Sequence, residues 1–146
     1  MFLLQVVKVI EFILIILFLI YASVFDLKWH SVPVIPVIAV LILEVAAGLF
    51  LRGRSHVIIS LIPGIVILLL SLCKGSGIGV GDGFVAMITG LFLGIEGELV
   101  SLYFSFILSG IFSVGLIAVK KGNKRTEIPF VPFMAAGFLI EKAVTL

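Results

Sequence analysis

Long apolar runs separated by short polar breaks constrain this chain more than any other feature of its sequence. A helix needs about 20 apolar residues to cross the hydrocarbon core of a bilayer, with a range near 17–25. The apolar runs predict six helices, at about residues 9–25, 32–51, 57–73, 84–95, 99–119 and 129–144. The fourth is short and rich in small residues, so we expect it to lie inside the protein.

The composition agrees with a membrane protein. Of 146 residues, 62% are hydrophobic and 12% are charged, whereas soluble domains carry about twice that charged fraction. We therefore predict an all-α, polytopic membrane protein with about six transmembrane helices and a single membrane-embedded domain over residues 1–146. The basic residues form no stripe with stacking aromatics, which argues against nucleic-acid binding. The single Cys73 excludes an internal disulfide and a cysteine metal cluster.

Lysine and arginine in short loops predict the orientation of the chain. With six spans, the first, third and fifth end on one side of the membrane, and that side carries most of the basic residues: Lys28, Lys74, Lys120, Lys121, Lys124 and Arg125. The opposite side carries a mixed set: Arg52, Arg54, Lys142, Glu96 and Glu98. The bias places the first side in the cytoplasm, the termini outside, and Asp26 and Asp82 on the same cytoplasmic side.

Two aspartates stand at helix ends in this scheme. Asp26 ends the first helix and Asp82 opens the fourth. Carboxylates at membrane depth are costly, and they tend to face a bundle interior or a water-filled cavity. Two carboxylates brought close share one proton, because both do not ionise easily. Such a pair suits peptide hydrolysis: the ionised aspartate takes a proton from water while the protonated one polarises the scissile carbonyl.

The stretch "SGIGVGDGF", residues 76–84, places glycines around Asp82. Gly77, Gly79 and Gly81 allow positive φ and close approach of backbone to a substrate. Non-helical backbone at membrane depth is tolerated where it lines a cavity. The alternative is an interhelical turn capped by Asp82, and the loop taken alone favours that alternative.

Three segments together resemble one family. "GIGVGD", residues 77–82, resembles the glycine-aspartate motif of the type IV prepilin peptidases, which are GxGD-type intramembrane aspartic proteases. "DLKWHSVP", residues 26–33, is similar to the family's first aspartate motif. "IPFVPFMAAG", residues 128–137, resembles its closing segment of prolines, phenylalanines and small residues. The three matches occur in the family's order and span nearly the whole chain.

The resemblance implies a function and a site. It implies a multi-pass protein of the inner (cytoplasmic) membrane whose cytoplasm-facing site cuts the leader from type IV prepilins or pilin-like secretion subunits. Asp26 and Asp82 are then the catalytic pair. The residues expected to bind substrate or shape the cleft are Gly77, Gly79, Gly81, Lys28, Pro129 and Pro132. For Lys28, a role in anchoring the chain at the membrane surface is an equally good interpretation.

No cofactor and no metal site are expected, because the sequence has neither a paired histidine motif nor a cysteine cluster. The expected partners are the prepilin-like substrate and membrane lipid, and a homo-oligomer stays open.

The chain departs from the family pattern at two positions. Phe84 stands where the family commonly has lysine, and Val34 where a polar residue often follows the proline. The cysteine pairs of the bifunctional members are missing, so we expect a short protease-only form without the N-terminal methyltransferase region. Two alternatives stay open: a preflagellin-type signal peptidase, and a non-catalytic membrane subunit or small proton-coupled transporter.

Several other polar residues are more simply explained by a structural role than by a catalytic one. Lys8 and Glu11 are spaced as a same-face helical pair. Glu44 lies well inside the second helix, where we favour a hydrogen bond within the bundle over substrate binding. His56 is expected in a loop. Glu127, near the closing segment, is expected to attract a basic leader.

Overall fold

The computed structural model describes residues 1–119 and 127–145, and these form helices and connecting segments without any strand. The five helices are α1 (Phe2–Trp29), α2 (Val34–Leu51), α3 (Arg54–Ser71), α4 (Val80–Ala118) and α5 (Val131–Thr145). The all-α prediction is therefore confirmed over this part of the chain. Four helices, α1 to α4, are long and apolar enough to cross a membrane.

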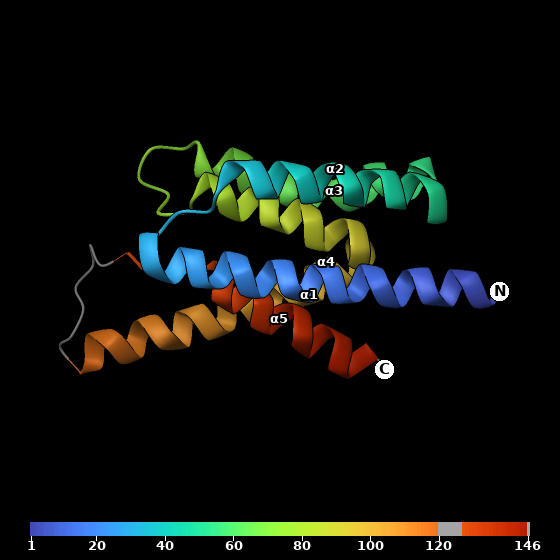
Figure 1. The fold of residues 1–146 in the computed structure, drawn as a ribbon. Coiled ribbons are helices and arrows are strands. Elements are labelled where there is room, and N and C mark those ends of the chain that lie inside the picture. The colour runs from blue at the N-terminus through green and yellow to red at the C-terminus, as the bar shows by residue number, and fades with distance from the viewer. Residues whose placement is uncertain (120–126, 146) are drawn as a thin grey trace.

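The long helix α4 contains a sharp turn at Gly94, whose φ of 80° and ψ of 170° are not helical. Glycine populates this region at no steric cost, whereas a side chain would be strained there. Its two halves run in opposite directions across Figure 1, so the fourth and fifth predicted helices form a helical hairpin. The prediction put the break at residues 96–98, and this was wrong. Glu96 and Glu98 lie within the helix that follows the turn.

The predicted number of six spans is not confirmed, because four helices meet the length and hydropathy requirements. The last predicted span corresponds to α5, which has 15 residues. At 1.5 Å per residue this helix is about 22 Å long, less than the roughly 30 Å of a hydrocarbon core.

The helices lie roughly side by side. In Figure 1, α2 and α3 lie on one side of α1, and α5 with the second half of α4 lies on the other. The most extensive contacts join α3 to α4 and α4 to α5. The core between them is apolar and is centred on Ile15, Val85, Ile88, Met134 and Phe138.

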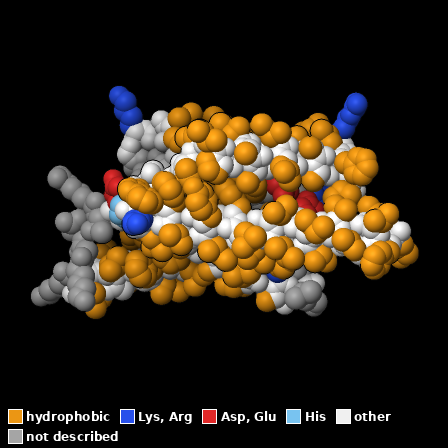
Figure 2. All heavy atoms as spheres, in the orientation of Figure 1, with side chains coloured by type: hydrophobic (Ala, Val, Ile, Leu, Met, Phe, Trp, Pro, Cys, Tyr) orange, Lys and Arg blue, Asp and Glu red, His pale blue; other side chains and the backbone are white. Residues whose placement is uncertain are grey.

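The outer surface is apolar as well. Figure 2 shows hydrophobic side chains over most of the visible face. Large aliphatic and aromatic residues are exposed along all of α1 to α4. Such a surface is unfavourable in water but suits lipid, which solvates apolar side chains. The helices and the surface together indicate a membrane protein.

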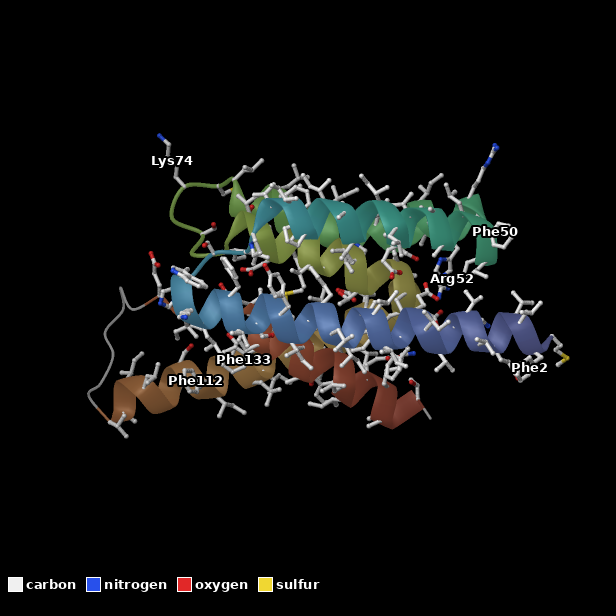
Figure 3. The ribbon with its side chains drawn as sticks, in the orientation of Figure 1. Phe2, Phe50, Arg52, Lys74, Phe112 and Phe133 are labelled. Atoms are coloured by element: carbon white, nitrogen blue, oxygen red, sulfur yellow. The ribbon has the colours of Figure 1, made fainter. Side chains whose placement is uncertain are left out.

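The two ends of the bundle differ. Both termini lie at one end in Figure 1, and the segment between α3 and α4, residues 72–79, lies at the other. This segment is called the glycine loop. Figure 3 places Lys74 at the loop end and Arg52 toward the end with the termini. The basic residues Lys120, Lys121, Lys124 and Arg125, used to predict orientation, lie outside the described residues.

Ionic contacts inside the bundle differ from those predicted. Glu11 accepts two hydrogen bonds from the Arg52 guanidinium, at 2.7 and 2.8 Å, rather than pairing with Lys8. A bidentate pair of this kind is the strong geometry for arginine and carboxylate. Glu44 is buried beside Glu11, which agrees with a structural role. His56 lies in α3, not in a loop, with Nδ1 3.4 Å from the Ser60 hydroxyl.

Candidate active site

A cavity of about 520 Å³ opens at the loop end of the bundle. It lies where the end of α1, the start of α2, the glycine loop, the start of α4 and residues 127–130 converge. Asp26 and Asp82 both line it. The sequence prediction that these two carboxyl groups meet at one end of the bundle thus agrees with the structure.

Asp26 stands in the last turn of α1 and is 5% exposed. Its Oδ2 accepts a hydrogen bond at 3.1 Å from the backbone N–H of Val131, the first residue of α5. The first N–H groups of a helix have no partner within that helix, and the helix N-terminus favours a negative charge. The α5 N-terminus therefore holds the Asp26 carboxyl group in a fixed orientation.

Asp82 stands in the first turn of α4, three residues after the N-cap Gly79, and is 7% exposed. Its Oδ2 accepts a hydrogen bond at 3.1 Å from the Gly79 N–H, and its own N–H donates to the Gly79 carbonyl at 3.1 Å. This is the carboxylate half of a capping box. The helix start thus fixes Asp82 at the cavity wall in the same way that α5 fixes Asp26.

Two glycines are required by geometry, Gly77 in the loop and Gly81 in the first turn of α4. Gly77 has a φ of +67°, which glycine adopts without strain. A Cβ on Gly81 would lie 2.8 Å from Val32 Cγ2, so glycine lets the start of α4 approach the segment before α2. Both residues line the cavity, as does Gly79. The glycine loop is therefore a cavity wall as well as a capped turn.

Six of the eight predicted site residues line the cavity: Asp26, Asp82, Gly77, Gly79, Gly81 and Pro129. The other two do not. Lys28 is exposed, with Nζ 4.9 Å from the centre of the Trp29 ring. Pro132 is half-buried in the first turn of α5.

Acidic side chains outnumber basic ones among the described residues that line the cavity. Three carboxyl groups line it, those of Asp26, Asp82 and Glu127, and no lysine or arginine of the described chain does so. Apolar side chains form much of the remaining wall, including Val34 and Phe84, the two positions that depart from the family pattern. The cavity therefore combines a carboxylate pair, a negative rim and an apolar surface.

Sequence reasoning missed some contributors. His30 lines the cavity and caps α1 in the left-handed region, with a φ of 50°. Its neighbour Ser31 also lines the cavity. Their position directly after the Asp26 turn is the signal that could have included them. The backbone donors of Gly79 and Val131 carry no side-chain signature, and only the fold reveals them.

No group of three histidine, cysteine, aspartate or glutamate side chains in residues 1–119 and 127–145 is arranged to hold a metal ion. Asp26 and Asp82 give the cavity two buried carboxyl groups that can take part in acid–base chemistry. One can act as a general base toward water, and the other can donate a proton to a carbonyl oxygen.

Comparison with known families decides the relationship. The family model of the type IV leader peptidases matches residues 13–114, more than half of the chain. The chain belongs to the type IV leader peptidase family. The matched segment includes both cavity aspartates and the glycine loop. Comparisons with curated proteins and with solved structures gave no match. This leader peptidase relative is thus a membrane protein of a protease family.

Proposed function

We propose that this protein is an aspartic endopeptidase that removes the leader from type IV prepilins or pilin-like secretion subunits. The proposal rests on one observation: Asp26 and Asp82 line the same cavity, and each accepts a hydrogen bond from a backbone N–H group. Family membership supports a peptidase that acts on leaders. Paired carboxyl groups support the aspartic type of mechanism.

The proposed reaction needs only water and the two carboxyl groups. The ionised aspartate takes a proton from water as the water oxygen bonds to the scissile carbonyl carbon, and the protonated aspartate gives its proton to the carbonyl oxygen. The tetrahedral intermediate then collapses and the C–N bond breaks. The leaving nitrogen takes the proton held by the first aspartate, and the second aspartate takes back a proton from a hydroxyl group of the intermediate, whose oxygen becomes the carbonyl oxygen of the new carboxyl group. Both carboxyl groups return to their starting pair with one proton between them.

The cavity walls support a substrate with two different ends. A basic leader is attracted by the three carboxyl groups, with Glu127 at an exposed position of the rim. The apolar segment that follows a leader fits against the wall formed by Val37, Ile38 and Phe84. Lys28 lies in the last turn of α1 and Lys74 follows α3, both at the cavity end of the bundle, and this supports a cytoplasm-facing site in the cytoplasmic membrane.

The test is leader removal from a prepilin of the same genome, co-expressed with the full chain and followed by gel mobility. Asp26→Asn and Asp82→Asn should each abolish cleavage, because amides neither accept the water proton nor donate a carboxyl proton. Glu96→Gln, an exposed acidic residue outside the cavity, is the matched control and should cleave normally. Cleavage that survives in either aspartate variant would rule out the mechanism.

A wild-type protein that cleaves no leader from a panel including preflagellins and pilin-like subunits would contradict the proposed activity. Proton or ion flux that requires the same aspartates would then favour a transporter. A protein that tolerates asparagine at both positions would instead fit a non-catalytic subunit.

A further inference from the structure

The turn at Gly94 divides α4 into two halves, residues 80–93 and residues 95–118. Asp82 belongs to the first half. Asp26 accepts its hydrogen bond from Val131, at the start of α5, and α5 lies beside the second half of α4 (Figure 1). The angle between the two halves therefore contributes to the distance between the two cavity carboxyl groups.

Each half of α4 is packed tightly against one neighbouring helix. On the first half, a Cβ built on Gly83 would lie 2.8 Å from the Leu68 Cα of α3. On the second half, the Ser101 carbonyl and the Ser105 hydroxyl occupy the space that a side chain on Gly137 of α5 would need. Packing this close leaves little room for one helix to slide past the other. The bundle thus contains two units, α3 with the first half of α4 and α5 with the second half.

A buried hydrogen bond joins the two units close to the turn. The Thr89 hydroxyl, on the first half of α4, lies 3.0 Å from Glu98 Oε1 on the second half. Glu98 is 0% exposed and Thr89 is 1% exposed. A Cβ on Gly90 would lie 2.6 Å from the Ser60 carbonyl oxygen and 3.4 Å from Glu98 Cγ. Glycine next to Thr89 therefore lets α3 and the Glu98 side chain both approach the first half.

Glu98 is an unusual residue to bury in a membrane bundle. An ionisable side chain in the membrane interior is costly and indicates a function by default. Within the described chain, Oε2 of Glu98 has no hydrogen-bond partner, and an apolar side chain would avoid the cost of burying that oxygen. Thr89 does not need Glu98 either, because its hydroxyl also lies 3.1 and 3.3 Å from two backbone carbonyl oxygens of its own helix. Stability alone therefore does not account for the contact.

A hydrogen bond restricts geometry in a way that apolar packing does not. Phe92 and Phe138, whose ring centres are 5.9 Å apart, pack the first half of α4 against α5. Such apolar contacts are non-directional, whereas a hydrogen bond weakens steeply outside a narrow range of distance and angle. Buried polar pairs therefore help to specify one arrangement of a core.

The place of this hydrogen bond gives it leverage over the cavity. At 1.5 Å per residue, Thr89 lies about 8 Å from the turn and Asp82 about 18 Å from it along the helix axis. A rotation about Gly94 therefore moves Asp82 roughly twice as far as Thr89. We propose that Glu98 is a positioning residue whose hydrogen bond to Thr89 sets the angle between the halves of α4 and thereby the spacing of the two cavity carboxyl groups. Its effect on cleavage rests on the proposed function.

Matched variants separate the hydrogen bond from side-chain shape. Glu98→Met keeps an unbranched side chain and removes both oxygens, and Thr89→Val keeps the shape of threonine and removes its hydroxyl. Glu98→Gln and Thr89→Ser keep the hydrogen bond, because an amide and a hydroxyl can each donate and accept. Ser113→Ala is the control, since it removes a hydroxyl that donates at 2.8 Å to the Ser109 carbonyl within the second half of α4.

The first measurement needs no substrate. Nitroxide labels at Leu69 of α3 and Ile111 on the second half of α4, both exposed, report the angle between the two units by double electron–electron resonance on the full chain in detergent micelles. The exposed Cys73 is first replaced by serine. The distance distribution should shift or broaden in Glu98→Met and stay as in the wild type in Glu98→Gln and Ser113→Ala. The same distribution in all of these proteins would overturn the proposal.

The second measurement is leader cleavage at several substrate concentrations, expressed per amount of folded protein. Glu98→Met should lower kcat about 10- to 100-fold, the effect of a displacement near 1 Å, and should leave KM unchanged. It should be no less stable than the wild type, because a well-packed apolar residue commonly replaces a buried ionisable one without loss. Thr89→Val should cause no further loss in the Glu98→Met background, because both changes remove the same hydrogen bond. Glu98→Gln and Thr89→Ser should cleave at the wild-type rate.

Several cleavage results would count against the proposal. These are a normal kcat in Glu98→Met, a loss of activity no greater than its loss of folded protein, additive losses in the double variant, and slow cleavage by Glu98→Gln. A wild type that cleaves no leader would remove the proposed function instead. In that case a label distance that changes in Glu98→Met would still support the role of Glu98 in spacing the carboxyl groups, and an unchanged distance would overturn it.

Discussion

Helix α3 packs very closely against the first half of α4 at Gly64. A Cβ built on Gly64 would lie 2.5 Å from the Met87 backbone nitrogen and 2.8 Å from its Cα. Carbon contacts are ordinarily about 3.5–4.0 Å. Backbone atoms cannot move aside as the tip of a side chain can, so Gly64→Ala should push the two helices about 1 Å apart.

The expected cost follows from two opposing effects. Overpacking a tight contact typically costs about 1–3 kcal/mol. Alanine in place of glycine returns up to about 1 kcal/mol through helix propensity. Because backbone atoms make this contact, we expect an overpacking cost near the upper end, about 3 kcal/mol. After the gain in helix propensity, the unfolding free energy should fall by about 2 kcal/mol. Because Met87 and Asp82 lie on the same half of α4, a shift of this size should also move Asp82 and reduce the cleavage rate roughly 100-fold.

The assay is denaturant unfolding in detergent micelles together with leader cleavage. Gly110→Ala is the matched control, because Gly110 lies on the second half of α4 and a Cβ there would meet no atom within 4 Å. That variant should be unchanged or slightly more stable and should cleave normally. Equal stability of the Gly64 and Gly110 variants would refute the packing argument. Reduced stability with normal cleavage would refute the link to Asp82.

Three further predictions address other contacts. Arg52→Ala leaves Glu11 buried without its partner and should lower unfolding free energy by about 3–5 kcal/mol, whereas Arg54→Ala, at an exposed position, should change it little. Val131→Pro removes the N–H that holds Asp26 at a helix position where proline is tolerated. It should slow cleavage about 10- to 100-fold, the size expected for a hydrogen bond to a charged group, while Val131→Ala should cleave far better. Excess chelator should leave cleavage unchanged, and a loss restored by zinc would contradict the carboxylate mechanism.

The placement of both aspartates at one end of the bundle was predictable, because its signals are local. Glycines at alternating positions before Asp82, and a charged break after the first apolar run, mark both aspartates in the sequence. Counting spans then puts them at one end of the bundle, since helices that alternate in direction return to the same side. The backbone donors from Gly79 and Val131 were not predictable, because any residue can supply an N–H group.

The position of the turn within α4 was predicted wrongly from the local sequence. Two glutamates at residues 96 and 98 predict a polar loop, yet the chain turns at Gly94 and buries Glu98 within the next helix. A positive φ is what the turn requires, and glycine supplies it. Whether a glutamate faces solvent or the bundle interior depends on which helix packs beside it, and local sequence does not report that.

By itself, the sequence determined that this chain enters a membrane as helices, because runs of apolar residues can satisfy their backbone hydrogen bonds in lipid only in that form. It also determined which carboxyl groups border the glycine loop. The tertiary structure alone decided that Lys28 and Pro132 lie off the cavity, that Arg52 pairs with Glu11, and that Glu98 is buried with its Oε1 3.0 Å from the Thr89 hydroxyl. These are contacts between distant segments, and they depend on the rotation and packing of whole helices, which apolar periodicity leaves undefined.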